Sequence, residues 1–326
     1  MLLTKRVVGW IIDNSETERI QNQVFENVFR ENERENSFMG RMRTKRGTVS
    51  RMIPGLDREQ LRNTLPIYDS NQVESDIEIW NKLDKRFRVL ETLTNHCIKG
   101  SARSLIVHGP AGLGKSYTVE KALEAWDPTM KYHTIMKGGA TKIGLLKTLY
   151  QFRNKKNVIV FDDCDSVLLD LDCVSLLKAA CDTTETRRIS YLSNDKIPAE
   201  GENGTIPSTW TFEGTIIFIT NTDFENTAKK LQDHTSAMIS RSHYISLGMK
   251  TKRDYVIRIK QVVTQGLFKG LGLGADEIKD VMDYIDNNID SLRELSLRMA
   301  LKLGGLRKDS PDVWMDLADV TCTRNS

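Results

Sequence analysis

The stretch Gly109-Pro-Ala-Gly-Leu-Gly-Lys-Ser116 decides the fold of this chain. It matches the pattern G-x-x-x-x-G-K-[ST], and it lies between a short apolar run, SLIVHG at 104–109, and a helix-forming segment, SYTVEKALEAW at 116–126. Its glycines allow the backbone to wrap around a phosphate, so that several N–H groups and the amino end of the helix point at the anion. The motif therefore predicts a phosphate-binding loop.

The chemistry of the loop assigns roles to single side chains. Lys115 is expected to reach the β- and γ-phosphates of a nucleotide, and the Ser116 hydroxyl is expected to ligate Mg²⁺. The predicted nucleotide contacts are Gly109, Pro110, Ala111, Gly112, Leu113, Gly114, Lys115, Ser116 and Tyr117.

An acidic pair ends the apolar strand predicted at 157–162, NVIVFD. Asp162 is predicted to hold the Mg²⁺ ion, directly or through water. Asp163 is placed to orient and deprotonate an attacking water molecule. Two adjacent buried acids without a cation would be costly, which disfavours a purely structural role. Asp165 is expected to be a helix-cap or turn residue.

Apolar runs that alternate with helical patterns set the fold class. Unbroken apolar strands are typical of a parallel sheet covered on both faces by helices, so the chain is predicted to be α/β. Beyond Gly248 only helices are expected, and they form a small all-α lid. The expected strands are 104–109, 131–136, 157–162, 215–221 and 243–247, and the expected lid helices are 251–268, 275–288, 291–303 and 311–320.

Four regions follow from these patterns. They are a helical, partly disordered N-terminal extension (1–75), the α/β nucleotide domain (76–248), the helical lid (249–308) and a C-terminal helix and tail (309–326). The basic arm at 41–51, RMRTKRGTVSR, is either a solvated arm or a contact for the phosphate backbone of a nucleic acid.

The composition is that of an ordinary soluble protein, and we expect it to be cytoplasmic. The 326 residues carry a net charge of +3, which is too small to indicate nucleic-acid binding by itself. No apolar run is long enough to span a bilayer, so no membrane partner is expected. The five cysteines have no metal-binding or redox spacing and are expected to be reduced.

From about Asp76 to Arg307 the chain resembles the AAA+ ATPase superfamily. That family usually carries Asp-Glu where this chain has Asp162-Asp163. The resemblance implies that Asn221, which ends the strand TIIFITN, is the sensor 1 residue that positions water. It also implies that Arg241, in AMISRSHYISL, is an arginine finger that enters the neighbouring subunit's site. Arg298 or Arg293 would supply the sensor 2 arginine from the third lid helix, with Arg298 preferred.

Two segments are candidates for substrate contact. Lys142-Ile143-Gly144 takes the position where protein-threading family members carry an aromatic–hydrophobic–glycine triplet. The lysine could grip a phosphate backbone, but the simpler interpretation is a turn that leads into a helix. The segment at 187–214 is expected to form a hairpin. Within it, Arg187, Arg188 and Trp210 either contact nucleic acid or, in the case of Trp210 together with Phe212, pack the hairpin onto the core.

The resemblance implies an ATPase that uses ATP and Mg²⁺ at the interfaces of a homo-oligomeric ring or filament. Such an enzyme would remodel or load a macromolecule, and the plan of the chain looks like phage or bacterial enzymes of DNA replication, recombination or loading. DNA or a DNA-processing protein is therefore an expected partner. A protein-remodelling chaperone and a nucleotide-gated assembly module with little hydrolysis are the alternatives.

Overall fold

The computed structural model describes residues 74–193, 196–199, 204–223 and 229–324. The chain divides into two compact units, Met1–Val73 and Glu74–Ser326, and the described residues all belong to the second. The predictions for the N-terminal extension and its basic arm at 41–51 lie outside the described residues.

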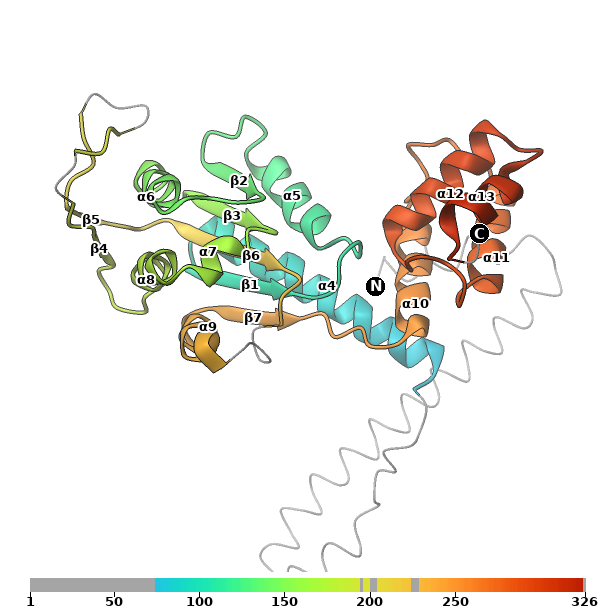
Figure 1. Cartoon of the computed structure of the whole chain (residues 1–326), viewed down its shortest axis with the longest axis horizontal. Coiled ribbons are helices and arrows are strands. Elements are labelled where there is room, and N and C mark those ends of the chain that lie inside the picture. The colour runs from blue at the N-terminus through green and yellow to red at the C-terminus, as the bar shows by residue number, and fades with distance from the viewer. Residues whose placement is uncertain (1–73, 194–195, 200–203, 224–228, 325–326) are drawn as a thin grey trace, which may run out of the picture. The chain divides into compact units, whose positions relative to one another are not determined.

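A five-stranded parallel sheet forms the centre of the second unit (Figure 1). Its order is β2-β3-β6-β1-β7, so the strand that precedes the phosphate loop, β1, lies between β6 and β7. Because all strands are parallel, the carboxyl ends of β1, β3 and β6 meet at one edge of the sheet. The strands are β2 (His133–Lys137), β3 (Val158–Asp162), β6 (Thr215–Thr220), β1 (Ser104–His108) and β7 (His243–Ser246).

The two faces of the sheet bury alternate residues, as the two-residue period of a strand requires. Ile106 packs with Phe161 and Phe218 on the face covered by α6, α8 and α9, whereas Val107 packs on the face covered by α4 and α5 (Figure 1). The predicted α/β class is confirmed for the described residues. The covering helices are α4 (Asp76–Lys99), α5 (Lys115–Trp126), α6 (Lys142–Gln151), α8 (Leu171–Ala180) and α9 (Lys229–Arg241).

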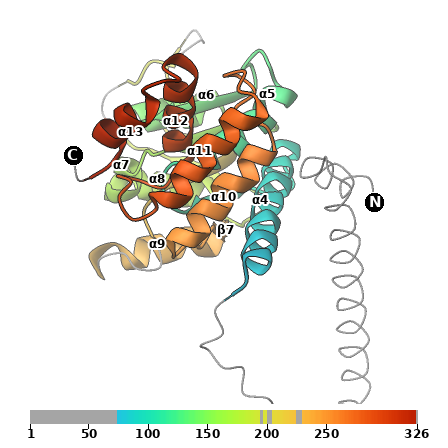
Figure 2. The same ribbon diagram turned by 90° about the vertical axis from the view of Figure 1, so that its right-hand side faces the viewer.

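A four-helix lid follows the sheet and has a hydrophobic core of its own. Figure 2 shows its first helix, α10, beside α4, where the Gln261 side chain donates a hydrogen bond of 2.7 Å to the Trp80 carbonyl. The C-terminal helix α13 packs into the same core through Trp314 and Ala318. The lid helices are α10 (Lys252–Thr264), α11 (Ala275–Asn287), α12 (Leu297–Asp309) and α13 (Trp314–Cys322).

The third lid helix begins six residues later than the sequence predicts, at Leu297 instead of at residue 291. The Ser296 side chain accepts a hydrogen bond from the Met299 N–H and so caps the helix at that point. Leu292 instead forms an isolated antiparallel bridge with Thr323. The prediction that Arg293 lies in this helix is therefore wrong.

The predicted hairpin is present as the antiparallel pair β4 (Arg188–Ser190) and β5 (Thr209–Thr211). Ile189 and Trp210 pair across it and are both buried in the core beside α6 and α8. Between β3 and α8 lies the short helix α7 (Ser166–Leu169).

All five cysteines lie among the described residues, and each is buried and unpaired. Four belong to the sheet domain, and Cys322 ends the last lid helix. Within the described part of the chain, no helix combines the length and apolarity that crossing a membrane requires.

Candidate nucleotide site

The phosphate loop joins the end of β1 to the start of α5. Gly112 and Gly114 have φ angles of 74° and 92°, a left-handed backbone conformation that favours glycine over residues with a side chain. Gly114 also occupies the N-cap position of α5 and offers no side chain to its first turn. The amino end of α5 is therefore left without a side-chain cap, as anion binding by its N–H groups requires.

The Lys115 side chain is folded into this loop. Its ammonium donates hydrogen bonds to the carbonyls of Gly109 and Pro110 and, at 2.8 Å, to the side-chain oxygen of Asn221. Burial lowers the pKa of Lys115 from 10.5 to about 8, although the nearby carboxylates of Asp163 and Asp162 partly oppose this shift. The lysine thus lies between the loop and the acidic edge of the sheet.

The serine that follows contacts the predicted metal carboxylate. The Ser116 hydroxyl donates a hydrogen bond of 2.8 Å to Asp162, whose residue is only 6% exposed. Asp163 has a left-handed φ of 53°, which is uncommon for a residue with a side chain. Its side chain is exposed and accepts a hydrogen bond of 2.9 Å from the Asn221 amide.

Asp165 contacts the turn that follows β6 at the same edge of the sheet. Its two carboxylate oxygens accept hydrogen bonds of 2.7 Å from the hydroxyls of Thr220 and Thr222. These threonines flank Asn221, so Asp165 fixes the turn that presents the Asn221 side chain. Asp165 also occupies the N-cap position of α7, although its side chain makes no cap hydrogen bond there.

A cavity of about 430 Å³ opens over the loop, a size within the usual range for small-molecule sites. Ser116, Asp163 and Asn221 lie in its polar wall. The lid contributes Val262, Leu267, Leu297, Arg298 and Leu301. Backbone N–H groups, a buried lysine, and hydroxyl and carboxylate oxygens fit a nucleotide with Mg²⁺, which prefers oxygen ligands. These are the residues that would hold the two cofactors predicted from the sequence.

The structure separates the two candidate sensor 2 arginines. Arg298, in the first turn of α12, lines the cavity and is exposed. Arg293 does not line it, and its guanidinium donates a hydrogen bond of 2.8 Å to the Thr323 carbonyl instead. Tyr117, which is 65% exposed, also lines the cavity, with the Lys121 ammonium over its ring.

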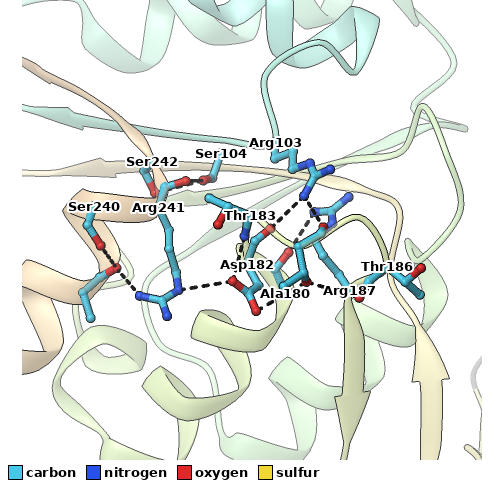
Figure 3. Close-up of polar contacts among 12 residues, drawn as sticks. Arg103, Ser104, Ala180, Asp182, Thr183, Thr186, Arg187, Ser240, Arg241 and Ser242 are labelled. Carbon is cyan, nitrogen blue, oxygen red and sulfur yellow. Dashed lines mark hydrogen bonds and ion pairs between the residues drawn. The ribbon is translucent and has the colours of Figure 1, made fainter.

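Arg241 lies at the opposite edge of the sheet from the phosphate loop. Its carbonyl accepts a hydrogen bond of 3.0 Å from Ser104, the first residue of β1, whereas the loop follows the last residue of that strand (Figure 3). Five strand residues at about 3.3 Å each span about 16 Å. The arginine therefore does not belong to the cavity of its own subunit.

The candidate substrate segments have mostly structural contacts. Lys142 forms an ion pair of 2.7 Å with Asp172 and lies over the Tyr191 ring. Trp210 and Phe212 are buried, which supports the packing role for them. Arg187 is buried as well and donates to the Ala180 carbonyl, while the side chain of Arg188 is exposed.

Sequence reasoning missed Arg258, a buried arginine that connects the lid to the phosphate loop. Its guanidinium donates a hydrogen bond of 3.3 Å to the Leu113 carbonyl and lies 3.3 Å from the centre of the Phe87 ring. Burial lowers the pKa of Arg258 to about 10, so it stays charged at neutral pH. A charged residue within the apolar run YVIRIKQVV was the available signal.

Lys137, at the end of β2, was missed too. Its ammonium lies 2.6 Å from a carboxylate oxygen of Glu120 and 3.6 Å from one of Asp162. It therefore adds a second positive charge beside the predicted metal carboxylate.

The fold and the site together define an α/β protein with a P-loop sequence motif between β1 and α5 and a helical lid over it. No family model matches the chain. An enterobacteria phage T4 protein, described as an uncharacterized 36.7 kDa protein in the nrdC-mobD intergenic region, is 35% identical over 266 residues, 77% of this chain and 79% of the phage protein. The chain belongs to the same family as that phage protein.

Solved structures overlap the chain only in part. Domain III of the Thermotoga maritima replication initiation protein DnaA is 12% identical, with a TM-score of 0.39, over 70% of this chain and 85% of that one. The S. cerevisiae Hsp104:casein complex is 13% identical, with a TM-score of 0.42, over 74% of this chain and 40% of that one. Overlaps this low carry no functional argument.

Proposed function

We propose that this protein is an ATPase of the AAA+ type that binds MgATP in the cavity over the phosphate loop and hydrolyses it between subunits. The observation that carries the proposal is the bridge formed by Asn221. Its oxygen accepts from Lys115 and its amide nitrogen donates to Asp163, so one side chain links the phosphate-binding lysine to the predicted base.

Each polar residue of the site is assigned one role in ATP hydrolysis. Lys115 exchanges its contacts with the loop carbonyls for phosphate oxygens. Asp162 and Ser116 would hold the metal, and a bound Mg²⁺ would neutralise developing charge on the phosphates. Asp163 accepts a proton from the attacking water, and Asn221 keeps that water and Asp163 in line. Arg298 extends from the lid and contacts the phosphates when the lid closes over the bound nucleotide.

The place of Arg241 supports the proposal that hydrolysis occurs between subunits. The arginine lies at the edge of the sheet opposite its own phosphate loop, so it is out of reach of its own nucleotide and is available to a neighbour's. A homo-oligomer, either a ring or a filament, brings these two edges together through heterologous contacts. An arginine supplied in this way stabilises charge on the transferring phosphate and raises the rate by about three to five orders of magnitude.

The work that hydrolysis drives is the remodelling or loading of a macromolecule in DNA metabolism. This setting is proposed from the plan of the chain, which resembles phage and bacterial enzymes of DNA replication, recombination or loading. A nucleotide-gated assembly module is the second candidate, and Asp163 favours it, because an aspartate holds its carboxylate one methylene further back than a glutamate. Measuring the rate of ATP turnover with single-stranded DNA, double-stranded DNA or unfolded protein distinguishes these two candidate functions. DNA-stimulated turnover supports the first, and assembly without turnover supports the second.

Mixing two inactive variants tests the shared site directly. Lys115→Ala removes nucleotide binding but keeps Arg241, and Arg241→Ala keeps the loop but removes the arginine. An equal mixture should regain activity at about a quarter of its interfaces, where an intact loop meets an intact arginine. If the mixture stays as inactive as its components although both variants assemble, hydrolysis between subunits is contradicted.

A further inference from the structure

The carboxylate of Asp182 faces the guanidinium of Arg241 at the amino edge of the sheet (Figure 3). Nε of Arg241 lies 3.8 Å from the nearer carboxylate oxygen, which is an ion-pair distance rather than that of a hydrogen bond. Nε has no hydrogen-bond partner among the described residues, and Nη1 donates to the Ala237 carbonyl at 2.9 Å. The arginine is thus held within its own subunit by one hydrogen bond and one weak ion pair.

The segment that carries Asp182 is fixed far more firmly than the arginine. Arg103 donates to the carbonyls of Asp182 and Thr184, and Arg187 donates to the Ala180 carbonyl at 2.8 Å (Figure 3). The Thr183 N–H donates to the Asp182 carboxylate at 2.7 Å. Asp182 is therefore a fixed anion, and the Arg241 side chain is the partner that is able to leave.

We propose that Asp182 is a positioning residue that holds Arg241 in the unassembled subunit and competes for it with the neighbouring subunit's nucleotide. This inference rests on the proposed function, because it requires Arg241 to act on a neighbour. A triphosphate carries several negative charges and accepts two parallel hydrogen bonds from a guanidinium, so it displaces a single carboxylate at 3.8 Å. A nucleotide that lacks the terminal phosphate displaces it less well.

The strength of the pair suits such an exchange. The Nε atom itself is covered, but the side chains of Arg241 and Asp182 are 32% and 37% exposed, and partly exposed ion pairs at this distance contribute little. Asp182 therefore biases Arg241 without trapping it. Removing the carboxylate should lower the protein concentration needed for half-maximal ATP turnover by about two- to fivefold.

The experiment compares full-length Asp182→Asn with the unaltered protein. We expect the lower midpoint concentration, together with an unchanged affinity of the dilute, unassembled protein for ATP, since Asp182 lies far from the subunit's own cavity. The asparagine oxygen still accepts from Thr183, and Asp182→Ser is a second neutral variant in case the first is poorly folded. Asp182→Glu keeps a carboxylate at this position, so its midpoint concentration for ATP turnover should stay close to that of the unaltered protein. Asp290→Asn, which removes an exposed partner of Lys252, is the matched charge control.

The possible results distinguish a failure of the role given to Asp182 from a failure of the proposed hydrolysis between subunits. If both neutral variants have the midpoint of the unaltered protein while Arg241→Ala abolishes turnover, the role of Asp182 is overturned and the proposed function stands. If Arg241→Ala turns over ATP at the normal rate, the proposed function fails first. If Asp290→Asn lowers the midpoint as much as Asp182→Asn, the effect is one of net charge, and the inference is overturned as well.

Discussion

The side-chain oxygen of Asn221 accepts a hydrogen bond from the Lys115 ammonium at 2.8 Å, although 106 positions separate the two residues. The sheet order explains the contact, because the strand before the phosphate loop and the strand that ends just before Asn221 are direct neighbours. Any change at position 221 should therefore affect both the lysine and Asp163.

Asn221→Ala should reduce the rate constant of ATP hydrolysis by about 100- to 1,000-fold, the usual loss when one preorganised polar group is removed from a reacting site. The affinity for ATP should change much less, because the loop and Lys115 remain. Single-turnover kinetics and equilibrium binding measure the two effects separately. A variant that loses binding and hydrolysis equally would show that Asn221 only shapes the loop.

The affinity for ATP should fall as the pH rises above about 8. Burial lowers the pKa of Lys115 to about 8, and a bound polyphosphate favours the protonated form, so binding above this pH requires the uptake of a proton. Titration calorimetry at pH 8.5 in two buffers of different ionisation enthalpy would detect that proton. Lys115→Arg, which stays charged, should show no uptake.

The lowered pKa of Lys115 also makes the free energy of unfolding depend on pH. Between about pH 8 and 10.5 the unfolded chain binds more protons at Lys115 than the folded protein does, so this group makes the free energy of unfolding rise with pH in that window. Lys115→Met should lack this contribution. Urea unfolding of both proteins at several pH values measures it, and parallel pH profiles would contradict the assignment.

Gly112→Ala should destabilise the protein more than Gly100→Ala. The two glycines have φ angles of 74° and 75°, so an alanine pays about the same left-handed strain of 1–2 kcal/mol at either site. A Cβ at position 112 would lie 2.7 Å from the Ser296 Cβ of the lid, whereas one at position 100 would meet nothing within 4 Å. Thermal unfolding midpoints and ATP affinities of the pair should differ; equal losses would show that the lid yields freely.

Arg258→Met should lower the free energy of unfolding by about 1–3 kcal/mol, because the Leu113 carbonyl loses a buried donor. It should also weaken ATP binding, since the lid loses one of its ties to the phosphate loop. Arg258→Lys is the informative control. It keeps the charge but loses the flat group over Phe87, so it should not restore stability. Full recovery with lysine would mean that charge alone matters at this position.

Local patterns predicted most of the sheet domain. The unbroken apolar strands and the phosphate loop carry signals within a few residues, and the structure has all five strands and the hairpin where they were expected. The start of the third lid helix was mispredicted, because Leu292 and Leu295 continue the apolar period upstream of the residue that caps the helix, Ser296.

Local sequence patterns could not predict contacts between segments that lie far apart in the sequence. Arg258 reaches a carbonyl 145 positions away, and Lys137 meets Asp162 only because β2 and β3 are paired. The hairpin illustrates the same limit. Its strands were readable from the sequence, but whether Trp210 faced solvent or the core depended on the helices packed beneath it.

The five buried cysteines give the folded protein a built-in reporter of local opening. Burial raises the pKa of Cys97 and of Cys181 to about 12, and a thiol that is both covered and protonated reacts very slowly with alkylating reagents. The rate at which Cys322 is modified then reports how often the lid opens. The rate at which Cys97 is modified reports how often helix α4 separates from the sheet. Mass spectrometry of partly alkylated protein would therefore resolve the two events without any introduced label.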